Sequence, residues 1–548
     1  SVMAAFIDSW WLSVKAEYAQ DETDKYKAYA KTIILNWANR ILFAHIIKHK
    51  QNGAMIVDEI DYDKTPNEAN AIFKKITEKC DFYNVFSAVR YNEALPELSW
   101  QDFVEFSNFL SSNGIDHLNQ ETLQNILEGS VATSKRAING QYTTPTELAK
   151  LLVRLTVKNW SDTILDCCCG TGTIPKEAIQ IKKTQMTAKE AVETVWACDK
   201  NNYPLQVANI SMTEPDTINI ANRLFQHNAL TLSIGEKITI TNPETGGNMI
   251  LALPAFVAVV SNLPFVPFEI IPADDKDEIS KMPFVDILDG RSDLYCYIAT
   301  KIADVIKPEG TLGIIVSNSW LGTNAGIKLM EALKQEYNIK QVHISGQGRW
   351  FKNADVVTTI LVLEKKKNSN CVDTDFWLWQ LSLEQLAENP DAENTLVNSA
   401  LLSSELDRSV SKLSKYSQSQ IESILNLNVC YNALFHDVNW LIDIKDRIIP
   451  INKVYNVFRG SRRGWDALFY PQRGEHRIEP QYLKKVLINA RNVTKLVATA
   501  DRDAFCCGVA IEELKKRGHS GALSWIEKFA EQRNGVGKPL PAVLKRTG

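Results

Sequence analysis

The sequence lacks the features of a membrane protein, a disulfide-rich protein or a metalloprotein. No run of its 548 residues approaches the 18 or so uninterrupted apolar residues of a membrane span. The ten cysteines include Cys167, Cys168 and Cys169 in a row, and neighbours of this kind do not make a disulfide framework. No Cys-x-x-Cys pair occurs, and the eight histidines are scattered. We therefore expect a cytoplasmic protein with no membrane segment and no metal site.

An overall excess of positive charge is also missing, because the net charge is −4. The charge is unevenly distributed, however. Residues 451–548 carry 19 Lys and Arg against 9 Asp and Glu, a net of +10, so the other 450 residues carry −14. A basic segment on an acidic body is typical of a module that contacts phosphates, although a basic surface without a partner stays the alternative.

The first part of the chain, residues 1–128, predicts a helical N-terminal domain. Strand patterns are few there, and apolar residues recur at spacings of three and four. The residues expected to form one buried stripe are Ile33, Ile34, Trp37, Ile41, Leu42 and Ile46.

The next part, residues 129–365, alternates short β-rich apolar runs with helical stretches, which indicates a mostly parallel, doubly wound α/β sheet. The expected strands are Thr163–Cys167, Val192–Cys198, Phe256–Val260, Leu312–Val316 and Val356–Leu363. Residues 366–450 suggest a helical connector. Residues 451–548 form the basic segment, headed by Arg459-Gly-Ser-Arg-Arg-Gly-Trp465.

A glycine loop follows the first of these strands. Asp166 ends the strand, and Cys167-Cys-Cys-Gly170-Thr-Gly172 comes directly after it. Glycines at this place let a ligand approach the backbone, because no Cβ intervenes, and Asp166 can hold a cationic group such as a ligand ammonium. The loop alone fits dinucleotide, mononucleotide or S-adenosylmethionine binding. A phosphate-binding P-loop is excluded, since no Gly-Lys-Ser/Thr follows.

The next strand ends at Asp199, which lies 27 residues beyond Gly172. A carboxylate at this place can accept hydrogen bonds from both ribose hydroxyls. An isolated Asp here would often be a solvated helix cap, but together with the glycine loop it predicts an adenosine-containing cofactor.

The strand Phe256–Val260 is followed by Ser261-Asn262-Leu263-Pro264-Phe265. Methylating an adenine amino group needs two hydrogen-bond acceptors for its hydrogens and an aromatic face for the unstacked base, which is worth roughly 1–3 kcal/mol. The Asn262 amide, the Leu263 carbonyl and the Phe265 ring can supply these parts, and Pro264 restricts φ within the turn. An ordinary strand-ending turn is the alternative.

This turn resembles the Asn-Pro-Pro-Tyr/Phe motif of the N-6 adenine DNA methylases of restriction–modification systems, in particular type I modification subunits and type IIG enzymes. It departs from that motif at Leu263. Asp166–Gly172, with Cys168 inside it, is similar to the family's Asp-Pro-x-Cys-Gly-Thr-Gly motif, although Cys167 stands where the family has proline.

Gly140-Gln-Tyr-Thr-Thr-Pro145 is similar to the family segment that folds over the methionine part of the cofactor. The likeness implies that Tyr142, Thr144 and Pro145 line that pocket, and that Asn228 stands where the family has an Asp near the cofactor adenine. Read alone, Thr144 and Pro145 would simply start a helix.

The resemblance implies a class I methyltransferase fold, S-adenosylmethionine as cofactor and double-stranded DNA as partner, with residues 451–548 as an incomplete target-recognition segment. It also implies a separate specificity subunit or a nuclease module as further partners. Three alternatives stay open: the methylating part of a larger fused restriction enzyme, a DNA-binding subunit that Leu263 and Cys167 have weakened catalytically, and a methylase of protein glutamine. For Leu263→Pro we expect tolerance and a raised rate, since proline restricts φ.

Overall fold

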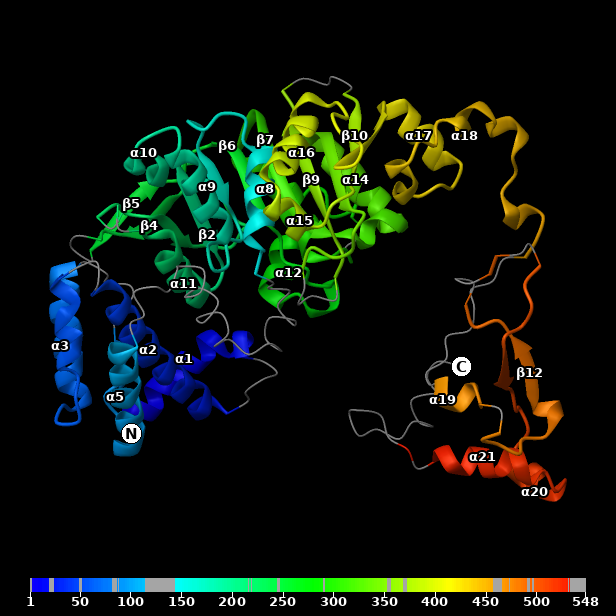
Figure 1. Cartoon of the computed structure of the whole chain (residues 1–548), viewed down its shortest axis with the longest axis horizontal. Coiled ribbons are helices and arrows are strands. Elements are labelled where there is room, and N and C mark those ends of the chain that lie inside the picture. Colours follow the sequence, from blue (N-terminus) through cyan, green and yellow to red (C-terminus); the bar gives the residue numbers. More distant parts are fainter. Residues whose placement is uncertain are drawn as a thin grey trace. The chain divides into compact units, whose positions relative to one another are not determined.

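The computed structural model describes most of the chain, which divides into two compact units, Ser1–Ile448 and Ile449–Gly548 (Figure 1). The described residues are 2–18, 24–48, 52–80, 86, 88–113, 143–214, 216–217, 219–243, 247–288, 291–351, 356–367, 372–456, 466–472, 474–489, 493–494, 497–530 and 532. Every helix within these ranges is too short or too polar to span a bilayer.

The first unit begins with helices packed around aromatic side chains. They are α1 (Val2–Tyr18), α2 (Lys25–Ile47), the 3-10 helix η1 (Asn52–Glu59), α3 (Pro66–Cys80) and α5 (Glu97–Ser112). The ring of buried Trp37 contacts Phe73 and Trp100, and its indole N–H donates to the Asn92 carbonyl at 2.9 Å. The predicted stripe on α2 is wrong at Ile34, which is 49% exposed. Successive residues of an α-helix are rotated by more than a quarter turn, so Ile34 points away from the core that its neighbour Ile33 faces.

The rest of the first unit is built on a nine-stranded sheet with the order β11-β10-β8-β9-β7-β6-β1-β2-β3. The strands are β1 (Ile164–Asp166), β2 (Val195–Asp199), β3 (Arg223–Gln226), β6 (Phe256–Asn262), β7 (Ile306–Ser317), β8 (Tyr337–Ser345), β9 (Thr358–Lys365), β10 (Thr374–Trp379) and β11 (Ser411–Tyr416). From β3 to β7 the neighbours are parallel, whereas β9 runs antiparallel to both β7 and β8. The predicted doubly wound α/β sheet is confirmed.

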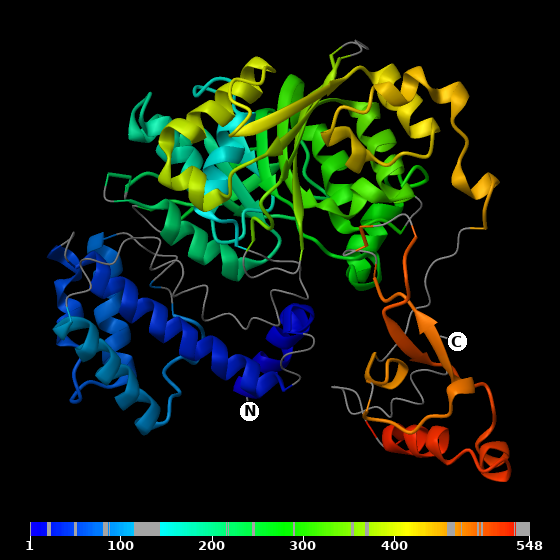
Figure 2. The same ribbon diagram turned by 45° about the vertical axis from the view of Figure 1, so that its right-hand side comes forward.

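Helices cover both faces of this sheet, as Figure 2 shows. One face packs against α8 (Thr146–Thr156), α9 (Thr173–Lys183), α10 (Ala188–Glu193), α11 (Asn202–Met212), α15 (Leu383–Glu388) and α16 (Pro390–Leu402). The other packs against α12 (Ala273–Ser280), α13 (Leu294–Lys301), α14 (Asn324–Glu336) and α17 (Gln418–Asn426). Neighbouring strand residues alternate between the two cores, with Ile314 in one and Ile315 in the other.

The remaining elements of this unit are short. They are the hairpin β4 (Lys237–Thr241) and β5 (Asn248–Ala252), helix α18 (Trp440–Asp443), and the 3-10 helices η3 (Phe268–Ile270), η4 (Ile302–Val305), η5 (Asn318–Gly322), η6 (Tyr431–Phe435) and η7 (Lys445–Arg447).

Residues 366–450 differ from the expected helical connector. They contribute β10 and β11 to the main sheet, β10 parallel to β8 and β11 antiparallel to β10, as well as α15, α16 and α17. Phe376, Trp377 and Trp379 of β10 are buried, so this segment completes the core of the sheet.

The strand order places the ends of three strands together. The chain passes from β1 to β2 and β3 on one side, then returns to β6 and β7 on the other side of β1. Asp166, Asp199 and Asn262 are the last residues of β1, β2 and β6. Ligands of open α/β sheets bind beyond the carboxyl ends of the strands where the order reverses, so these three residues mark the edge of the sheet at which a ligand is expected.

The second unit has a small core of its own. Its elements are η8 (Ile451–Lys453), α19 (Asp466–Phe469), η9 (Pro480–Tyr482), the antiparallel strands β12 (Leu483–Val486) and β13 (Arg502–Phe505), α20 (Ile511–Lys516) and α21 (Ser520–Ala530). The Glu479 carboxylate accepts hydrogen bonds from the Gly521 and Ala522 N–H groups at the start of α21, at 2.9 and 2.8 Å. The predicted segment from Arg459 to Trp465 lies outside the described residues.

Candidate active site

The loop after β1 has backbone angles that glycine adopts readily. Gly170 has φ 52° and Gly172 has φ 87°, both in the left-handed region. A Cβ added at Gly170 would meet no atom of the described residues within 4 Å, so the backbone there borders open space as far as they are concerned. At Gly172 it would lie 2.8 Å from Ser211 Oγ of α11. Gly172 therefore permits close packing of α9 on α11, while Gly170 leaves the loop open to a ligand.

Asp166 is a buried carboxyl group whose two oxygens differ. Oδ1 accepts from the Ser261 hydroxyl at 2.6 Å and from the Cys168 N–H at 3.2 Å. Oδ2 is buried and has no hydrogen-bond partner among the residues that the structure describes. Burial raises the pKa of Asp166 to about 7, helped by the nearby Asp199 and opposed by the hydrogen bonds from Ser261 and Cys168. Asp166 Oδ2 can therefore accept a hydrogen bond from a ligand, or form an ion pair with a cationic group of a ligand.

Cys168 contacts this carboxyl group through its backbone N–H, and its thiol interacts with that of Cys167. A hydrogen bond with the Cys167 thiol and burial both raise the pKa of Cys168 well above its usual value. The thiol therefore stays protonated at neutral pH, and Cys168 contributes its backbone N–H to the loop rather than a nucleophile.

Asp199 closes the glycine loop from the neighbouring strand. Its Oδ2 accepts from the Gly170 N–H at 3.1 Å, and its Oδ1 accepts from the Asn201 N–H at 2.8 Å. Burial raises the pKa of Asp199 above its usual value, although these two hydrogen bonds oppose that shift. The structure thus brings together Asp166, Gly170 and Asp199.

Asn228 lies two residues beyond the end of β3 and is held by a cluster of polar groups. Its amide oxygen accepts from the Leu230 N–H at 3.1 Å, and its amide nitrogen donates to Asp275 Oδ1 at 2.8 Å. Asp275 is 3% exposed and also binds the Lys200 ammonium at 2.8 Å. Helix α12, which follows the Asn-Leu-Pro-Phe turn, is therefore tied to the ends of β2 and β3.

The candidate catalytic turn begins at the end of β6. Asn262 pairs with Ile315 of β7 in the parallel ladder, and the next residue, Leu263, donates its backbone N–H to the Ile315 carbonyl at 3.1 Å. On the far side, the Leu294 N–H at the start of α13 donates to the Val266 carbonyl at 2.9 Å. The turn is therefore held at both ends by backbone hydrogen bonds.

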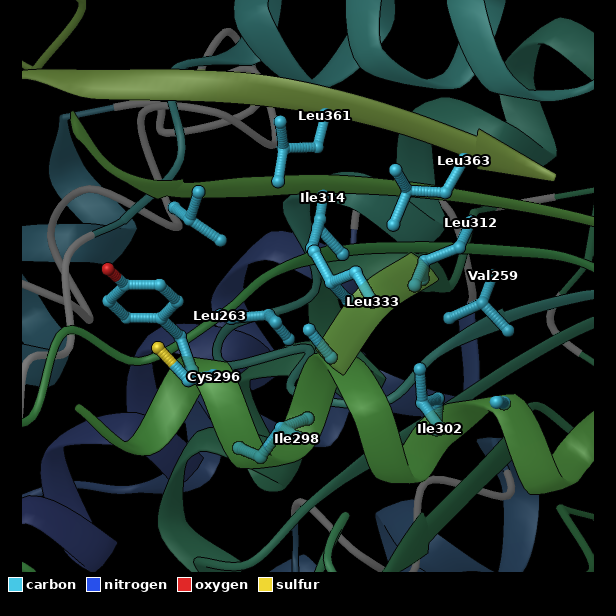
Figure 3. Close-up of a cluster of buried hydrophobic side chains, with 14 of the residues drawn as sticks. Val259, Leu263, Cys296, Ile298, Ile302, Leu312, Ile314, Leu333, Leu361 and Leu363 are labelled. Atoms are coloured by element: carbon cyan, nitrogen blue, oxygen red, sulfur yellow. The ribbon is translucent and has the colours of Figure 1, made fainter. Parts of the chain in front are cut away.

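The Leu263 side chain anchors the turn in the core. It is 1% exposed and lies among Cys296, Ile298 and Ile314, as Figure 3 shows. These two contacts argue against the expectation that Leu263→Pro is tolerated. Proline has no N–H for the Ile315 carbonyl and cannot fill the place of the leucine side chain.

The segment before α8 reaches the same turn. Asn262 Nδ2 donates to Thr144 Oγ1 at 3.1 Å, and Thr144 is 7% exposed. Pro145 is the residue that precedes α8, with φ −56°. Tyr142 lies outside the described residues. The structure thus joins Thr144 to the predicted catalytic amide across 118 positions of sequence.

Pro264 and Phe265, which complete the turn, are half-buried. The Phe265 ring meets the Phe351 ring edge to face, with centroids 6.4 Å apart and planes at 90°. Phe351 follows β8 and is 3% exposed. Two aromatic rings from distant segments therefore meet at the end of the turn.

Three residues of this site were not predicted from the sequence: Ser261, Asp275 and Phe351. Ser261 immediately precedes Asn262, so a small hydroxyl at a buried strand end was the available signal. Asp275 sits in the acidic helix Ala273–Ser280, which has no apolar pattern that distinguishes it from a solvated helix. Phe351 lies 86 positions after Phe265, and no local pattern connects them.

The sheet order, with the glycine loop at its reversal point, places this chain in the class I methyltransferase fold. Residues 122–424, more than half of the chain, match the family model described as N-6 DNA Methylase. The chain therefore belongs to the N-6 DNA methylase family, and the resemblance predicted from its motifs is confirmed.

Individual relatives are distant. The type II methyltransferase M.BanIII of Aneurinibacillus aneurinilyticus is 28% identical over 116 residues, which are 21% of this chain and 19% of that protein. The type IIG restriction endonuclease BpuSI is 14% identical, with a TM-score of 0.51 over 96% of this chain and 59% of BpuSI. A type I methyltransferase subunit from Streptococcus thermophilus is 15% identical, with a TM-score of 0.46 over 78% of this chain and 97% of that subunit. This chain thus spans less than two thirds of BpuSI, whose likeness shows a shared fold.

Proposed function

We propose that this chain is a site-specific DNA methyltransferase that moves a methyl group from S-adenosylmethionine to N-6 of adenine, within a restriction–modification or phage-defence system. One observation carries the proposal: Asp166, Asp199 and Asn262 end three neighbouring strands at the reversal point of the sheet. A cofactor crevice and an Asn-x-Pro-Phe turn therefore lie at the same edge, in a chain of the N-6 DNA methylase family.

S-adenosylmethionine is complementary to the carboxyl groups and the glycine backbone at this edge of the sheet. Its ammonium group suits Asp166 Oδ2, a buried carboxyl oxygen that accepts no hydrogen bond from the described part of the chain. The open space beside Gly170 admits a ligand against the backbone. Asp199 would accept hydrogen bonds from the ribose hydroxyls, which would replace part of its present hydrogen bonds from backbone N–H groups. When bound, the cofactor supplies a methyl group on a sulfonium centre.

The adenine end of the cofactor would lie toward β3, the next strand beyond Asp199. Asn228 and Asp275 are the polar side chains at that place, and Lys200 neutralises the Asp275 carboxylate. The Asn228 amide oxygen already accepts a hydrogen bond from the Leu230 N–H. We therefore assign the hydrogen-bond acceptor for the amino group of the cofactor adenine to Asn228 and Asp275 together rather than to Asn228 alone.

The chain's residues would act on the target adenine by positioning and polarisation. An exocyclic amino group is unreachable inside a duplex, so the base must be extruded. The Asn262 amide oxygen and the Leu263 carbonyl would accept the two amino hydrogens, which favours a pyramidal nitrogen with its lone pair directed at the methyl group. Phe265, whose ring meets Phe351, would stack on the base and contribute roughly 1–3 kcal/mol of binding. Direct transfer of this kind relies on proximity and orientation.

The second unit would contact double-stranded DNA. Its described basic side chains include Lys484 and Lys485 of β12, and Lys515 and Lys516 at the end of α20. Of these four cations, Lys485 is already paired with the Asp503 carboxylate and is less available to a phosphate. A nuclease module in a longer protein, or a separate specificity subunit, would complete a cytoplasmic restriction–modification system.

The identity of the product tests the proposal. The protein is incubated with S-adenosylmethionine and with genomic DNA amplified in vitro, which offers many sequences without prior methylation. The DNA is then digested to nucleosides and analysed by mass spectrometry. We expect N-6-methyladenine and no methylated cytosine. Methylated cytosine as the sole modified nucleoside, or binding of DNA without any methylated base, would each contradict the proposal.

A further inference from the structure

Ser261 carries a buried hydroxyl immediately before Asn262, and the chemistry proposed for the turn does not use it. It is 0% exposed and lies near the end of β6, which pairs with β1 in the parallel sheet. Its Oγ lies 2.6 Å from Oδ1 of Asp166, the last residue of β1. An ionised carboxylate carries no hydrogen, so in that form of Asp166 the Ser261 hydroxyl must be the donor. Ser261 thus ties the end of β6 to the carboxyl group of the neighbouring strand.

This hydrogen bond divides the two oxygens of Asp166 between the chain and a ligand. Oδ1 accepts from the Ser261 hydroxyl and, at 3.2 Å, from the Cys168 N–H. Oδ2 is buried and accepts no hydrogen bond from the described residues. Because a carboxylate is planar, two donors on Oδ1, one from a strand and one from the glycine loop, also restrict the direction of Oδ2. A buried charged oxygen is costly unless it is paired, so Oδ2 calls for a cationic partner.

We infer that Ser261 is a positioning residue that holds Oδ1 of Asp166 and so reserves Oδ2 for the ammonium group of the cofactor. The inference rests on the proposed function, and it gives a role to a residue that the family motifs of this sequence leave unassigned. Ser261 acts on the cofactor through Asp166. The end of β6 then serves both substrates, with Ser261 directed to the cofactor carboxyl group and Asn262 to the target base.

The same hydrogen bond favours the charged form of Asp166. Burial raises the pKa of Asp166 most, Asp199 adds to that rise, and the hydrogen bond from Ser261 is the largest influence that opposes it. The other titratable groups that interact with Asp166 are the thiols of Cys198 and Cys169. Burial raises the pKa of both thiols well above the usual value, so they stay uncharged at neutral pH. Removing the Ser261 hydroxyl should therefore raise the pKa of Asp166 further, and an ammonium group would have to displace a proton over a wider pH range.

Titration calorimetry with S-adenosylmethionine at pH 6 and at pH 8 tests the inference. Ser261→Ala removes the hydroxyl with little change of volume. We expect its dissociation constant to be about tenfold above that of the wild type at pH 6 and within about twofold of it at pH 8. This is the effect of moving the titration of Asp166 by about one pH unit, the scale of one hydrogen bond to a charged group. Variant and wild type are compared at the same pH, so ionisation of the ligand itself cancels.

Two controls separate positioning from a general loss of structure. Ser411→Ala also removes a fully buried hydroxyl, but from β11 at the edge of the sheet, and should leave cofactor affinity unchanged at both pH values. The second control uses 5′-methylthioadenosine, which keeps the adenosine of the cofactor and lacks the ammonium group. Its affinity should differ by less than about twofold between Ser261→Ala and the wild type, because a change near tenfold would correspond to a whole lost contact.

Two results would overturn the inference. One is an equal loss of S-adenosylmethionine affinity at pH 6 and pH 8, which is what a displaced strand end would produce. The other is a parallel loss of 5′-methylthioadenosine affinity, because Ser261 would then act on the adenosine part of the site. If the wild type binds neither ligand, the proposed function fails instead.

Discussion

Replacing Leu263 by proline would give this chain the Asn-Pro-Pro-Phe form of the family motif, and the structure predicts that the change is harmful. Deleting a buried leucine side chain costs about 2–5 kcal/mol, and a proline ring keeps part of that volume, so we take about 2 kcal/mol. Leaving the Ile315 carbonyl without its donor costs about 1–3 kcal/mol more. Restricting φ returns only about 0.4–1 kcal/mol. The net expectation is a loss of about 2–5 kcal/mol in the free energy of unfolding.

Urea unfolding, followed by tryptophan fluorescence, measures this loss. Leu263→Met is the matched control, because it keeps the N–H and nearly the same volume and should cost less than about 1.5 kcal/mol. The methionine variant should also retain methyl transfer. The proline variant should transfer methyl groups more slowly, because the turn that carries Asn262 is displaced. A proline variant that is as stable as the wild type and transfers faster would refute the reasoning, since Leu263 would then not anchor the turn.

Three further predictions concern the cofactor edge and the second unit. Because burial raises the pKa of Asp166 to about 7, a cationic ligand that binds below that pH must displace a proton. The affinity for S-adenosylmethionine should therefore rise about tenfold per pH unit from pH 5 to 7 and then level off. Asp166→Asn should remove this pH dependence, as measured by titration calorimetry. The sign for stability is the reverse, since the folded state holds the proton between pH 4 and 7, so this group's contribution to folding falls as the pH rises through that range. Asp275→Asn should weaken cofactor binding several-fold, whereas Asp274→Asn, which removes the exposed partner of Lys200, should leave it unchanged in the same assay. Removing residues 451–548 should flatten the salt dependence of DNA affinity by about 0.9 in log–log slope for each lost phosphate contact; an unchanged slope would locate the DNA surface elsewhere.

The strands that end at the candidate site could be predicted from the sequence because each is a short apolar run that ends in a polar residue. Asp166, Asp199 and Asn262 are the last residues of their strands, and a parallel sheet gathers such ends at one edge, so local pattern sufficed to bring them together. β11 could not be recognised in the same way. It is an edge strand with the polar sequence Ser-Lys-Leu-Ser-Lys-Tyr, which carries no apolar run.

Contacts between distant segments were beyond the reach of local pattern. The bond from Asn262 to Thr144, and the bond from Asn228 to Asp275, depend on where helices α8 and α12 pack, which periodicity does not encode. The same holds for Leu263. Its departure from the family's proline was visible, but its N–H bond to β7 and its burial became visible only in the folded chain.

Single-turnover methylation tests most directly whether the Asn262 amide acts on the reacting amino group. Asn262→Ala and the wild type are compared with saturating S-adenosylmethionine and DNA, and cofactor binding is measured in parallel. We expect transfer to fall at least about a hundredfold, the scale of a lost polar contact in a transition state, while cofactor affinity is retained. Wild-type transfer by Asn262→Ala, with N-6-methyladenine still formed, would contradict this role of the amide.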